Sequence, residues 1–384
     1  MSGRPLAGLR VVELARILAG PWIGQTLADL GADVVKVESP AGDDTRGWGP
    51  PFVDGTAAYF HACNRGKRSV VADFADDGDL AFVKRLIGRA DVVIENFRVG
   101  GLVRFGLDHA SVRAAHPGLV YCSVTGFGQD GPRAAEPGYD FMIQGLGGIM
   151  DLTGEPDGEP QKIGVAFADL FTGLYGVVAI QAALARRERT GEGDHVDMAL
   201  LDCMSGVLAN QAMNYLASGE SPRRLGNAHP NIVPYQSFAA ADGHVVVAVG
   251  NDAQFVRFCA ALGLAALADE PRFASNAGRV RHREALVPLL AKAIAGRGRD
   301  ELLDALRAVR VPCGPINTVA EVFAEPQLRH RGMAIEVDGV PGVRTPIRFA
   351  GATLALERRS PRLGEHDAQV RAELAEPGDT AHEG

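Results

Sequence analysis

Short apolar runs alternate with amphipathic segments over the first 130 residues. The runs predicted as strands span 9–14, 33–38, 69–74, 91–97 and 119–124, and the helices between them include 20–31 and 79–89. Strands interleaved with helices imply a parallel sheet that helices cover on both faces. Ligands of such sheets bind at the carboxyl ends of the strands. We therefore expect Arg16, Ser39 and the segment 96–98 to lie near a binding crevice.

The pattern changes after residue 195. We predict a long helical stretch from His195 to about Ala217, then a polar linker over 218–224. The elements expected beyond it are a β-hairpin over 235–250 with its turn at Asp242-Gly243, and helices near 253–262, 283–295 and 300–309. They indicate a smaller α/β domain over 225–325. The last segment should hold short strands with turns at Pro341-Gly342 and Pro361, and a helix from His366 to about Glu373.

Composition changes this picture little. The chain has 384 residues, of which 46% are hydrophobic and 22% charged, as expected of a soluble enzyme with two domains. A net charge of −8 argues against nucleic acid and anionic membrane surfaces as partners. Five scattered cysteines, with no CxxC pair, suggest reduced thiols in the cytoplasm. The amino terminus lacks the apolar core of a signal peptide, and residues 375–384 resemble a frayed tail.

The usual cofactor motifs are missing from the sequence. The turn after the first strand, 15–21, reads ARILAGP and not GxGxxG, and no GxxxxGK[ST] loop occurs. There is also no GxSxG elbow, no HExxH and no cluster of His and Cys. We therefore expect no metal and no tightly bound cofactor.

Asp169 is a lone carboxylate between an apolar run and an apolar helix. The helix is predicted over 170–185, with Gly173 and Gly176 at points of close helix contact. The Asp169 side chain has two interpretations. It is an N-cap that accepts hydrogen bonds from the first free amides, or it is a functional carboxylate kept in apolar surroundings at a cost.

Polar and cationic side chains follow several of the predicted strands. The cations that could attract phosphates are Arg16, Arg46, Lys67, Arg68, Arg98 and Arg104, although each could equally be a solvated surface charge. Asn96 could recognise an amide or an adenine edge and Phe97 could stack on a flat ring, or both could close a turn. Tyr139 and Asp140 could contact a substrate oxygen, or Asp140 could cap a helix beginning near Phe141.

Taken in order, these features resemble the class III CoA-transferases, the family that also includes α-methylacyl-CoA racemases. The matching motifs occur at 6–14, 20–21, 30–38, 47–48, 64–69, 95–97, 126–128, 138–140, Asp169 with 172–173, and 363–366. The resemblance implies an interlocked homodimer. It also implies a Rossmann-like large domain, 1–200 completed by 330–384, and a small domain over 225–325, with linkers at 201–224 and 326–331.

The resemblance also implies a site. Asp169 would be the nucleophile that attacks an acyl-CoA thioester, with helix-start dipoles stabilising the oxyanion. Tyr139 would support the acyl group, and the contacts to coenzyme A, which is a substrate here, would come from Arg16, Ile17, Asn96, Phe97 and Arg104. The other partner would be a small carboxylic acid.

Two departures and two alternatives accompany the resemblance. Ser39 stands where relatives often carry Arg or Lys, and 249–255 lacks the run of four glycines that closes over the intermediate in some transferases. A racemase would need a base where Tyr139 stands, and tyrosine is a poor one. A non-catalytic acyl-CoA-binding protein would not need Asp169. The segment 226–236 looks like members that use dicarboxylates, with Arg223, Arg224 and His229 as candidates for a distal carboxylate.

Overall fold

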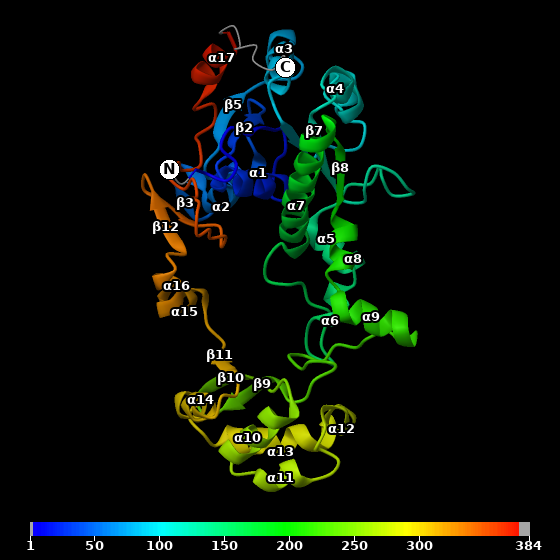
Figure 1. Cartoon of the computed structure of the whole chain (residues 1–384), viewed down its shortest axis with the longest axis vertical. Helices are drawn as coiled ribbons and strands as arrows, with labels where there is room; N and C mark the ends of the chain where they lie inside the picture. The colour runs from blue at the N-terminus through cyan, green and yellow to red at the C-terminus, as the bar shows by residue number, and fades with distance from the viewer. Residues whose placement is uncertain (1–2, 376–384) are drawn as a thin grey trace. The chain divides into compact units, whose positions relative to one another are not determined.

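A computed structural model describes residues 3–375, so part of the predicted tail lies outside the described residues. The chain divides into two compact units (Figure 1). Among the described residues, unit 1 comprises 3–149, 162–213 and 326–375, and unit 2 comprises 150–161 and 214–325. The segment 150–161 therefore joins unit 2, although it falls within the predicted range of the large domain.

Unit 1 is built on a six-stranded parallel sheet. Its strands are β1 (Arg10–Glu13), β2 (Asp33–Glu38), β5 (Arg68–Val71), β6 (Val92–Glu95), β7 (Val120–Thr125) and β8 (His195–Ala199). Their order in the sheet is β5-β2-β1-β6-β7-β8, so the winding direction reverses between β1 and β6. This is the Rossmann order, in which a crevice opens where the direction reverses. The predicted α/β fold with a Rossmann-like sheet is confirmed.

Helices cover both faces of this sheet, as alternation along the strands requires. Val11 belongs to one apolar core and Val12 to the other. The first core is closed by α1 (Ala19–Asp29), α5 (Asp140–Leu146), α7 (Phe167–Thr190) and α8 (Leu200–Gly206); the second by α3 (Asp77–Ile87), α4 (His109–Ala115) and α17 (Asp367–Ala375). By length and composition α7 could cross a membrane, and one of its sides is buried in the first core.

The predicted helix from His195 to Ala217 is wrong in its first five residues. These residues form β8, which pairs in parallel with β7 through partners such as Tyr121 and His195. The chain reaches this edge at Gly193, where a Cβ would lie 2.0 Å from the Leu119 carbonyl oxygen. The helical part follows as α8 and α9 (Ala209–Ser218). Strand pairing decided the conformation here, since local sequence pattern alone does not reveal a tertiary partner.

Smaller elements of unit 1 connect the layers. They are β3 (Phe52–Val53), β4 (Thr56–Ala57), α2 (Ala58–Asn64), the 3₁₀ turns η1 (Asp44–Gly47) and η2 (Val103–Phe105), α16 (Pro326–His330), β12 (Ala334–Val337) and β13 (Val340–Val343). The turn predicted at Pro341-Gly342 is wrong, because both residues lie within β13. The hairpin turns at Asp338-Gly339, with φ of 51° and 77°. A tight two-residue turn needs positive φ at both positions, which Asp-Gly provides.

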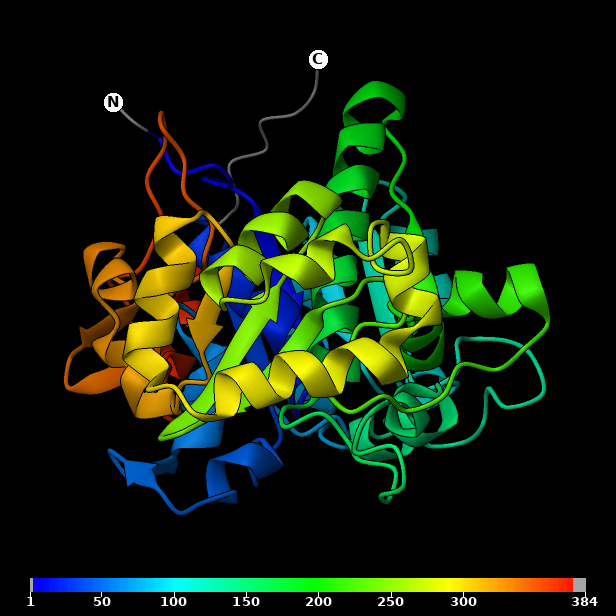
Figure 2. The ribbon, with the colours of Figure 1, turned by 90° about the horizontal axis from the view of Figure 1, so that it is seen from below.

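Unit 2 contains a three-stranded antiparallel sheet, β11-β10-β9, formed by β9 (Tyr235–Ala240), β10 (Gly243–Ala248) and β11 (Cys313–Pro315). The predicted hairpin is confirmed, but its turn lies one residue earlier than expected, at Ala241-Asp242, because Gly243 pairs with Ala240 as the first residue of β10. Figure 2 shows the light-green strands beside the yellow helices. The other helices of this region are α6 (Ile149–Leu152), α10 (Asp252–Ala261), α11 (Ala265–Asp269), α12 (Asn276–Arg281), α13 (Arg283–Ala295), α14 (Arg299–Ala308) and α15 (Val319–Ala324).

A buried ion network lies beneath β1 and β2. Lys36 Nζ is 3.1 Å from Glu13 Oε1, 3.0 Å from Asp43 Oδ2 and 2.8 Å from the Ala15 carbonyl oxygen. Lys67 Nζ lies 2.8 Å from Glu13 Oε2. A Cβ at Gly24 would come within 1.8 Å of that same oxygen, so only glycine fits there. The network ties the end of β1 to the turn that follows it.

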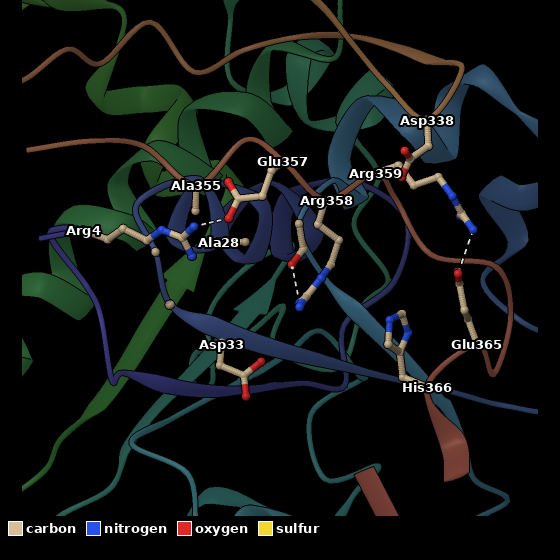
Figure 3. Close-up of a pocket in the computed structure, with 13 residues that line it drawn as sticks. Arg4, Ala28, Asp33, Asp338, Ala355, Glu357, Arg358, Arg359, Glu365 and His366 are labelled. Carbon is tan, nitrogen blue, oxygen red and sulfur yellow. Dashed lines mark hydrogen bonds and ion pairs between the residues drawn. The ribbon is translucent and has the colours of Figure 1, made fainter. Parts of the chain in front are cut away.

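A hollow of about 530 Å³ lies at the amino ends of β2 and β5 (Figure 3). Ion pairs dominate its wall: Arg4 pairs with Glu357, and Arg359 Nη2 lies 2.7 Å from Glu365 Oε1. Arg358 donates to the Gly66 carbonyl oxygen. These contacts fasten the carboxyl-terminal segment of unit 1 across the sheet. We call this feature the amino-side hollow.

Candidate active site

A second hollow of about 530 Å³, the cleft, opens at the carboxyl ends of β1 and β6, where the strand order reverses. Ser39, which was expected near this crevice, is not among the residues that line it, whereas all the site residues implied by the family resemblance are: Arg16, Ile17, Asn96, Phe97, Arg104, Tyr139 and Asp169. The turns after β1 and β6 form one wall, and the loop leading to Tyr139 forms another. The structure therefore brings together, within unit 1, residues up to 153 positions apart in the sequence.

Asp169 is the third residue of α7, so it is not the N-cap. The N-cap position is Ala166, and no side chain hydrogen-bonds to the helix start from there. Gly173 and Gly176 let α7 approach α1, as predicted: a Cβ at Gly176 would lie 2.5 Å from Ile23 Cδ1. Within residues 3–375, the Asp169 carboxylate makes no hydrogen bond and no ion pair. A partly buried carboxylate without a partner is costly, which favours a functional role.

The start of α7 is capped from another helix. Asp140 Oδ1 accepts from the Ala168 amide at 2.8 Å and from the Asp169 amide at 3.4 Å. Asp140 Oδ2 accepts from the buried side chain of Gln144 at 2.8 Å. Asp140 is itself the first residue of α5, so the expectation that it caps that helix is wrong. Because these two amides are already occupied, they are not free donors for an oxyanion.

The electrostatic surroundings of Asp169 favour its neutral form. Burial raises its pKa from 3.8 to about 7, and the nearby charge of Asp140 adds to the increase. Tyr59 also lies close: its pKa rises to about 12, through burial first and then through the charge of Asp169. A carboxylate with a pKa near 7 is more basic than an ordinary one, yet still ionised in a large fraction of molecules at neutral pH.

The turn after β1 is held from several sides. Ile17 has φ of 73°, a strained value for a β-branched residue. The Ile17 amide donates to the Asp43 carboxylate at 3.2 Å. The Asn96 side chain accepts from the Arg16 amide at 3.0 Å and donates to the Arg16 carbonyl oxygen at 2.7 Å. Asn96 therefore recognises an amide, as the sequence allowed, but the amide belongs to the protein. Its contribution to the cleft is to fix the position of Arg16 and Ile17.

The six candidate cations separate into two groups. Arg46, Lys67 and Arg68 form buried or half-buried ion pairs with Glu38, Glu13 and Asp33, so they are not solvated surface charges and their charge is already paired within the protein. Arg16 reaches Asp44 at 2.6 Å on the surface. Arg98 and Arg104 line the cleft, and neither forms an ion pair with any of residues 3–375. Arg104 lies over the Phe105 ring, 4.4 Å from its centroid.

The glycine-rich loop after β7 makes a close backbone crossing. A Cβ at Gly126 would lie 2.5 Å from the Gly138 Cα. This crossing brings Tyr139 to the cleft wall, where the residue is 63% exposed. Phe97 lies across the cleft in a ring contact with Phe74, with centroids 6.2 Å apart. An exposed aromatic ring at the rim and a half-buried one below it suit a ligand with an apolar or flat portion.

Sequence reasoning missed two groups. Tyr59 lies on α2, which gave no strand-end signal, and only the fold brings it near Asp169. Glu95 ends β6, is 5% exposed and accepts from the Phe97 amide at 2.8 Å. The sequence did contain a signal for Glu95, because a carboxylate that ends a buried apolar run needs a donor.

The fold and the cleft define a doubly wound α/β protein with an unpartnered carboxylate in a ligand-sized crevice. The chain belongs to CoA-transferase family III, whose model matches residues 6–367. The expected class, a CoA-transferase acting on CoA thioesters, is confirmed at the level of the family.

Individual relatives cover nearly the whole chain. A succinate–glutarate CoA-transferase of Agrobacterium fabrum is 55% identical, over 96% of this chain and 96% of its own. A succinyl-CoA:glutarate CoA-transferase of Mus musculus is 39% identical, over 97% and 87%. Among solved structures, a CaiB/BaiF family protein from Brucella suis is 64% identical, with a TM-score of 0.88 over 97% of this chain and 100% of that one.

Proposed function

We propose that this protein transfers coenzyme A between succinate and a second dicarboxylic acid such as glutarate, with Asp169 as the covalent nucleophile. The observation that carries the proposal is the Asp169 carboxylate, which lines the cleft without a hydrogen-bond partner in residues 3–375 and whose pKa is raised to about 7. Raised basicity strengthens a carboxylate nucleophile, and the site retains enough of the ionised form to react.

The reaction proceeds in four balanced steps. The Asp169 carboxylate attacks the thioester carbonyl, and the carbon–sulfur bond breaks to give a mixed anhydride and the CoA thiolate. The thiolate attacks the aspartyl carbonyl and releases the donor acid, which leaves an aspartyl-CoA thioester. The acceptor carboxylate then displaces the thiolate to form a second anhydride. The thiolate attacks the acceptor acyl carbon, which forms the product thioester and restores Asp169.

The other residues of the cleft bind and orient the thioester. Arg104, together with Arg98, supplies positive charge for phosphates, and Phe97 supplies a ring for stacking. Arg16 and Ile17 present a backbone that Asn96 and Asp43 hold fixed. Such preorganisation reduces the entropy lost on binding. Tyr139 supports the acyl portion at the rim. No tightly bound cofactor is required by these steps.

The dicarboxylate preference rests on the named activities of the relatives and on the segment 226–236 in unit 2. Three candidate groups lie in this segment or just before it, and of these Arg224 is already paired, with Nη1 3.1 Å from Asp151 Oδ1. His229 Nδ1 accepts from the Asn231 amide at 3.0 Å. Arg223 is exposed and forms no ion pair within the described residues. Of the three, Arg223 is therefore the candidate whose charge is not already used within unit 2.

A homodimer is part of the same proposal. In unit 1 large apolar side chains stay exposed on two neighbouring helices, with Phe141 at 63% on α5 and Val178 at 64% on α7. Tyr175 on α7 is 48% exposed. Large apolar side chains exposed on adjacent helices favour an interaction site, and a second copy of the chain is the partner that the family resemblance implies. Light scattering on the purified protein should give twice the mass of the chain.

Trapping tests the nucleophile directly. The protein is incubated with succinyl-CoA and then with hydroxylamine, and the peptide containing residue 169 is analysed by mass spectrometry. We expect a hydroxamate on Asp169 and none in Asp169→Ala. Asp130→Ala, which removes an exposed aspartate outside the cleft lining, should still be trapped at Asp169. An unmodified Asp169 across several acyl-CoA donors would instead favour a racemase or a binding protein.

A further inference from the structure

A buried polar array lies behind the cleft wall formed by 96–98. It begins at Glu95, whose Oε2 accepts from the Phe97 amide at 2.8 Å. Ser123 also hydrogen-bonds the Glu95 carboxylate, and the two residues are register partners on β6 and β7. Both side chains are buried, at 5% and 2% exposure. The carboxylate is thus the support of the turn that carries Asn96, Phe97 and Arg98.

The array continues to the sheet edge. Ser123 Oγ lies 3.0 Å from His195 Nε2 on β8. The His195 ring stacks on His109, with centroids 3.7 Å apart and planes 11° from parallel. Burial lowers the pKa of His195 to about 4, and the charges of His109 and Arg113 add to the decrease, so the ring is neutral at pH 7. The catalytic steps above use none of these groups.

Among residues 3–375 no ion pair joins Glu95 to a cation, although Arg98 and His109 line the same small hollow as Glu95. Burial raises the pKa of the Glu95 carboxyl from 4.5 to about 7, and the charge of Asp197 on β8 adds to the increase. The hydrogen bonds from Ser123 and Phe97 act in the opposite direction. Tyr121 and Cys122 on β7 also face Glu95, and the Glu95 charge contributes to raising the pKa of both. Asp108, in the loop before α4, faces the Tyr121 hydroxyl. A carboxylate in these surroundings changes charge within the physiological pH range.

We propose that Glu95 is a positioning residue whose ionised carboxylate holds the CoA-binding turn through the Phe97 amide, and whose protonation reverses the Glu95–Ser123–His195 hydrogen-bond chain and loosens that turn. This inference rests on the proposed binding of CoA in the cleft. It makes affinity for the CoA portion depend on pH, independently of the chemistry at Asp169.

Every proton in the reversal is accounted for. With Glu95 ionised, His195 Nε2–H donates to Ser123 and the Ser123 hydroxyl donates to Glu95. When Glu95 takes a proton from solvent, its O–H donates to Ser123 and the Ser123 hydroxyl donates to Nε2. His195 returns its Nε2 proton to solvent and takes one from solvent at Nδ1, so the neutral ring changes tautomer and the array gains one proton in all, on Glu95. The Phe97 amide loses a charge-assisted acceptor and keeps a weaker neutral one.

Calorimetric titration with dephospho-CoA tests the proposal. This probe lacks the 3′-phosphate, whose own pKa near 6 would otherwise obscure the result. We expect binding to tighten about fivefold from pH 6 to pH 8, as a neutral acceptor becomes a charged one. Protons should be released on binding near pH 7, detected by repeating the titration in buffers of different ionisation enthalpy. An affinity that stays constant over this range overturns the inference.

Variants separate Glu95 from its surroundings. Glu95→Gln should bind at pH 8 about as weakly as the wild type binds at pH 6, and its affinity should not change with pH. Ser123→Ala removes a hydrogen bond that lowers the Glu95 pKa, so its midpoint should move to higher pH. The matched control is Glu321→Gln, whose carboxylate also accepts a backbone amide, at 2.8 Å from Thr318, but lies in unit 2 outside the cleft lining.

The outcomes distinguish this inference from the proposed function. A Glu95→Gln protein that keeps the wild-type pH dependence overturns the role of Glu95. Should that variant fail to fold, the midpoint of Ser123→Ala still decides the question, because Asp169, whose pKa is also about 7, would not move with that substitution. Binding without pH dependence contradicts only the role of Glu95. A complete lack of dephospho-CoA binding at every pH contradicts the CoA site itself.

Discussion

Unit 1 contains two hollows of the same size, about 530 Å³ each, at opposite ends of one sheet. In the amino-side hollow the charges are largely satisfied: Arg4 pairs with Glu357, and Asp33 with Arg68. In the cleft, Asp169 and Arg104 line the wall without such partners in residues 3–375. Size therefore does not distinguish a structural gap from a site. The distinguishing property is the presence of charged side chains that have no ion-pair partner within residues 3–375.

The two ends differ in what the chain does there. At the amino ends, the carboxyl-terminal segment crosses the sheet, and its ion pairs hold it in place. At the carboxyl ends, the turns after β1 and β6 diverge because the winding direction reverses, and the cleft opens there. Backbone strain at Ile17 and buried carboxylates at Asp169 and Glu95 gather at this end. Natural proteins accept such local costs at functional sites.

The largest effect should come from removing one carboxylate at each end. Asp169→Ala should reduce CoA transfer by at least about 10³-fold, because loss of a covalent nucleophile removes the reaction path. Asp33→Ala breaks an ion pair with Arg68 at the amino-side hollow and should leave turnover within about twofold of wild type. Steady-state turnover with succinyl-CoA and glutarate measures both. Equal losses of turnover in the two variants would contradict the assignment of the active site to the cleft and not to the amino-side hollow.

A second pair of variants compares one arginine from each hollow. Arg104→Ala should raise KM for the acyl-CoA about tenfold with little change in kcat, because an unpaired guanidinium is free to bind phosphate. Arg358→Ala, which removes a side chain that donates to the Gly66 carbonyl, should leave KM unchanged. The Arg104 effect should shrink as salt is raised from 50 to about 300 mM, since screening weakens ionic contacts. A KM that rises equally in both variants contradicts the assignment of the CoA site.

The elements of the cleft differed in how far the sequence could predict them. The turn after β1 and the segment 96–98 were identified because a carboxyl-end position depends only on strand pattern. The reversal between β1 and β6 was not, because strand order depends on which way each crossover runs. An N-cap role on α7 was one of two interpretations of Asp169, because it stands at a helix start. In fact Asp140 provides it from another helix, which no local signal reveals.

The remaining errors have the same cause. Residues 195–199 read as the start of a helix because an apolar helical stretch follows, yet β7 offered them a strand partner. Pro341-Gly342 resembled a turn, but the hairpin closed three residues earlier at Asp338-Gly339. The local sequence pattern predicted conformation correctly where a residue interacts only within its own helix or strand. It failed where a partner distant in sequence decided the outcome.

A third prediction concerns the pairing of Asp140 with Asp169. Asp140→Asn keeps an oxygen for the Ala168 and Asp169 amides but removes the negative charge that raises the Asp169 pKa. The acid limb of the trapping rate should move to lower pH, with a rate at pH 6 about threefold higher than wild type. The shift should be partial, because burial is the larger cause of the raised pKa. Hydroxylamine trapping from pH 5 to pH 8 measures it, and an unmoved limb would show that the Asp140 charge does not act on Asp169.

The smallest effect is on stability and has opposite signs at the two hollows. The folded pKa of Asp169, about 7, lies above its ordinary value of 3.8. The stability it contributes is therefore fully present below pH 3.8 and is lost as pH rises to about 7, since burying the ionised form is unfavourable. Asp169→Asn removes that penalty and should raise Tm by about 3 °C at pH 8 relative to wild type, and by much less at pH 5. Asp33→Asn weakens the pair with Arg68 and should leave Tm unchanged or lower. Thermal melts of the three proteins at both pH values decide this. A stabilised Asp33→Asn, or an Asp169→Asn without gain at pH 8, would mean that the carboxylate in the cleft is no more costly than the paired one.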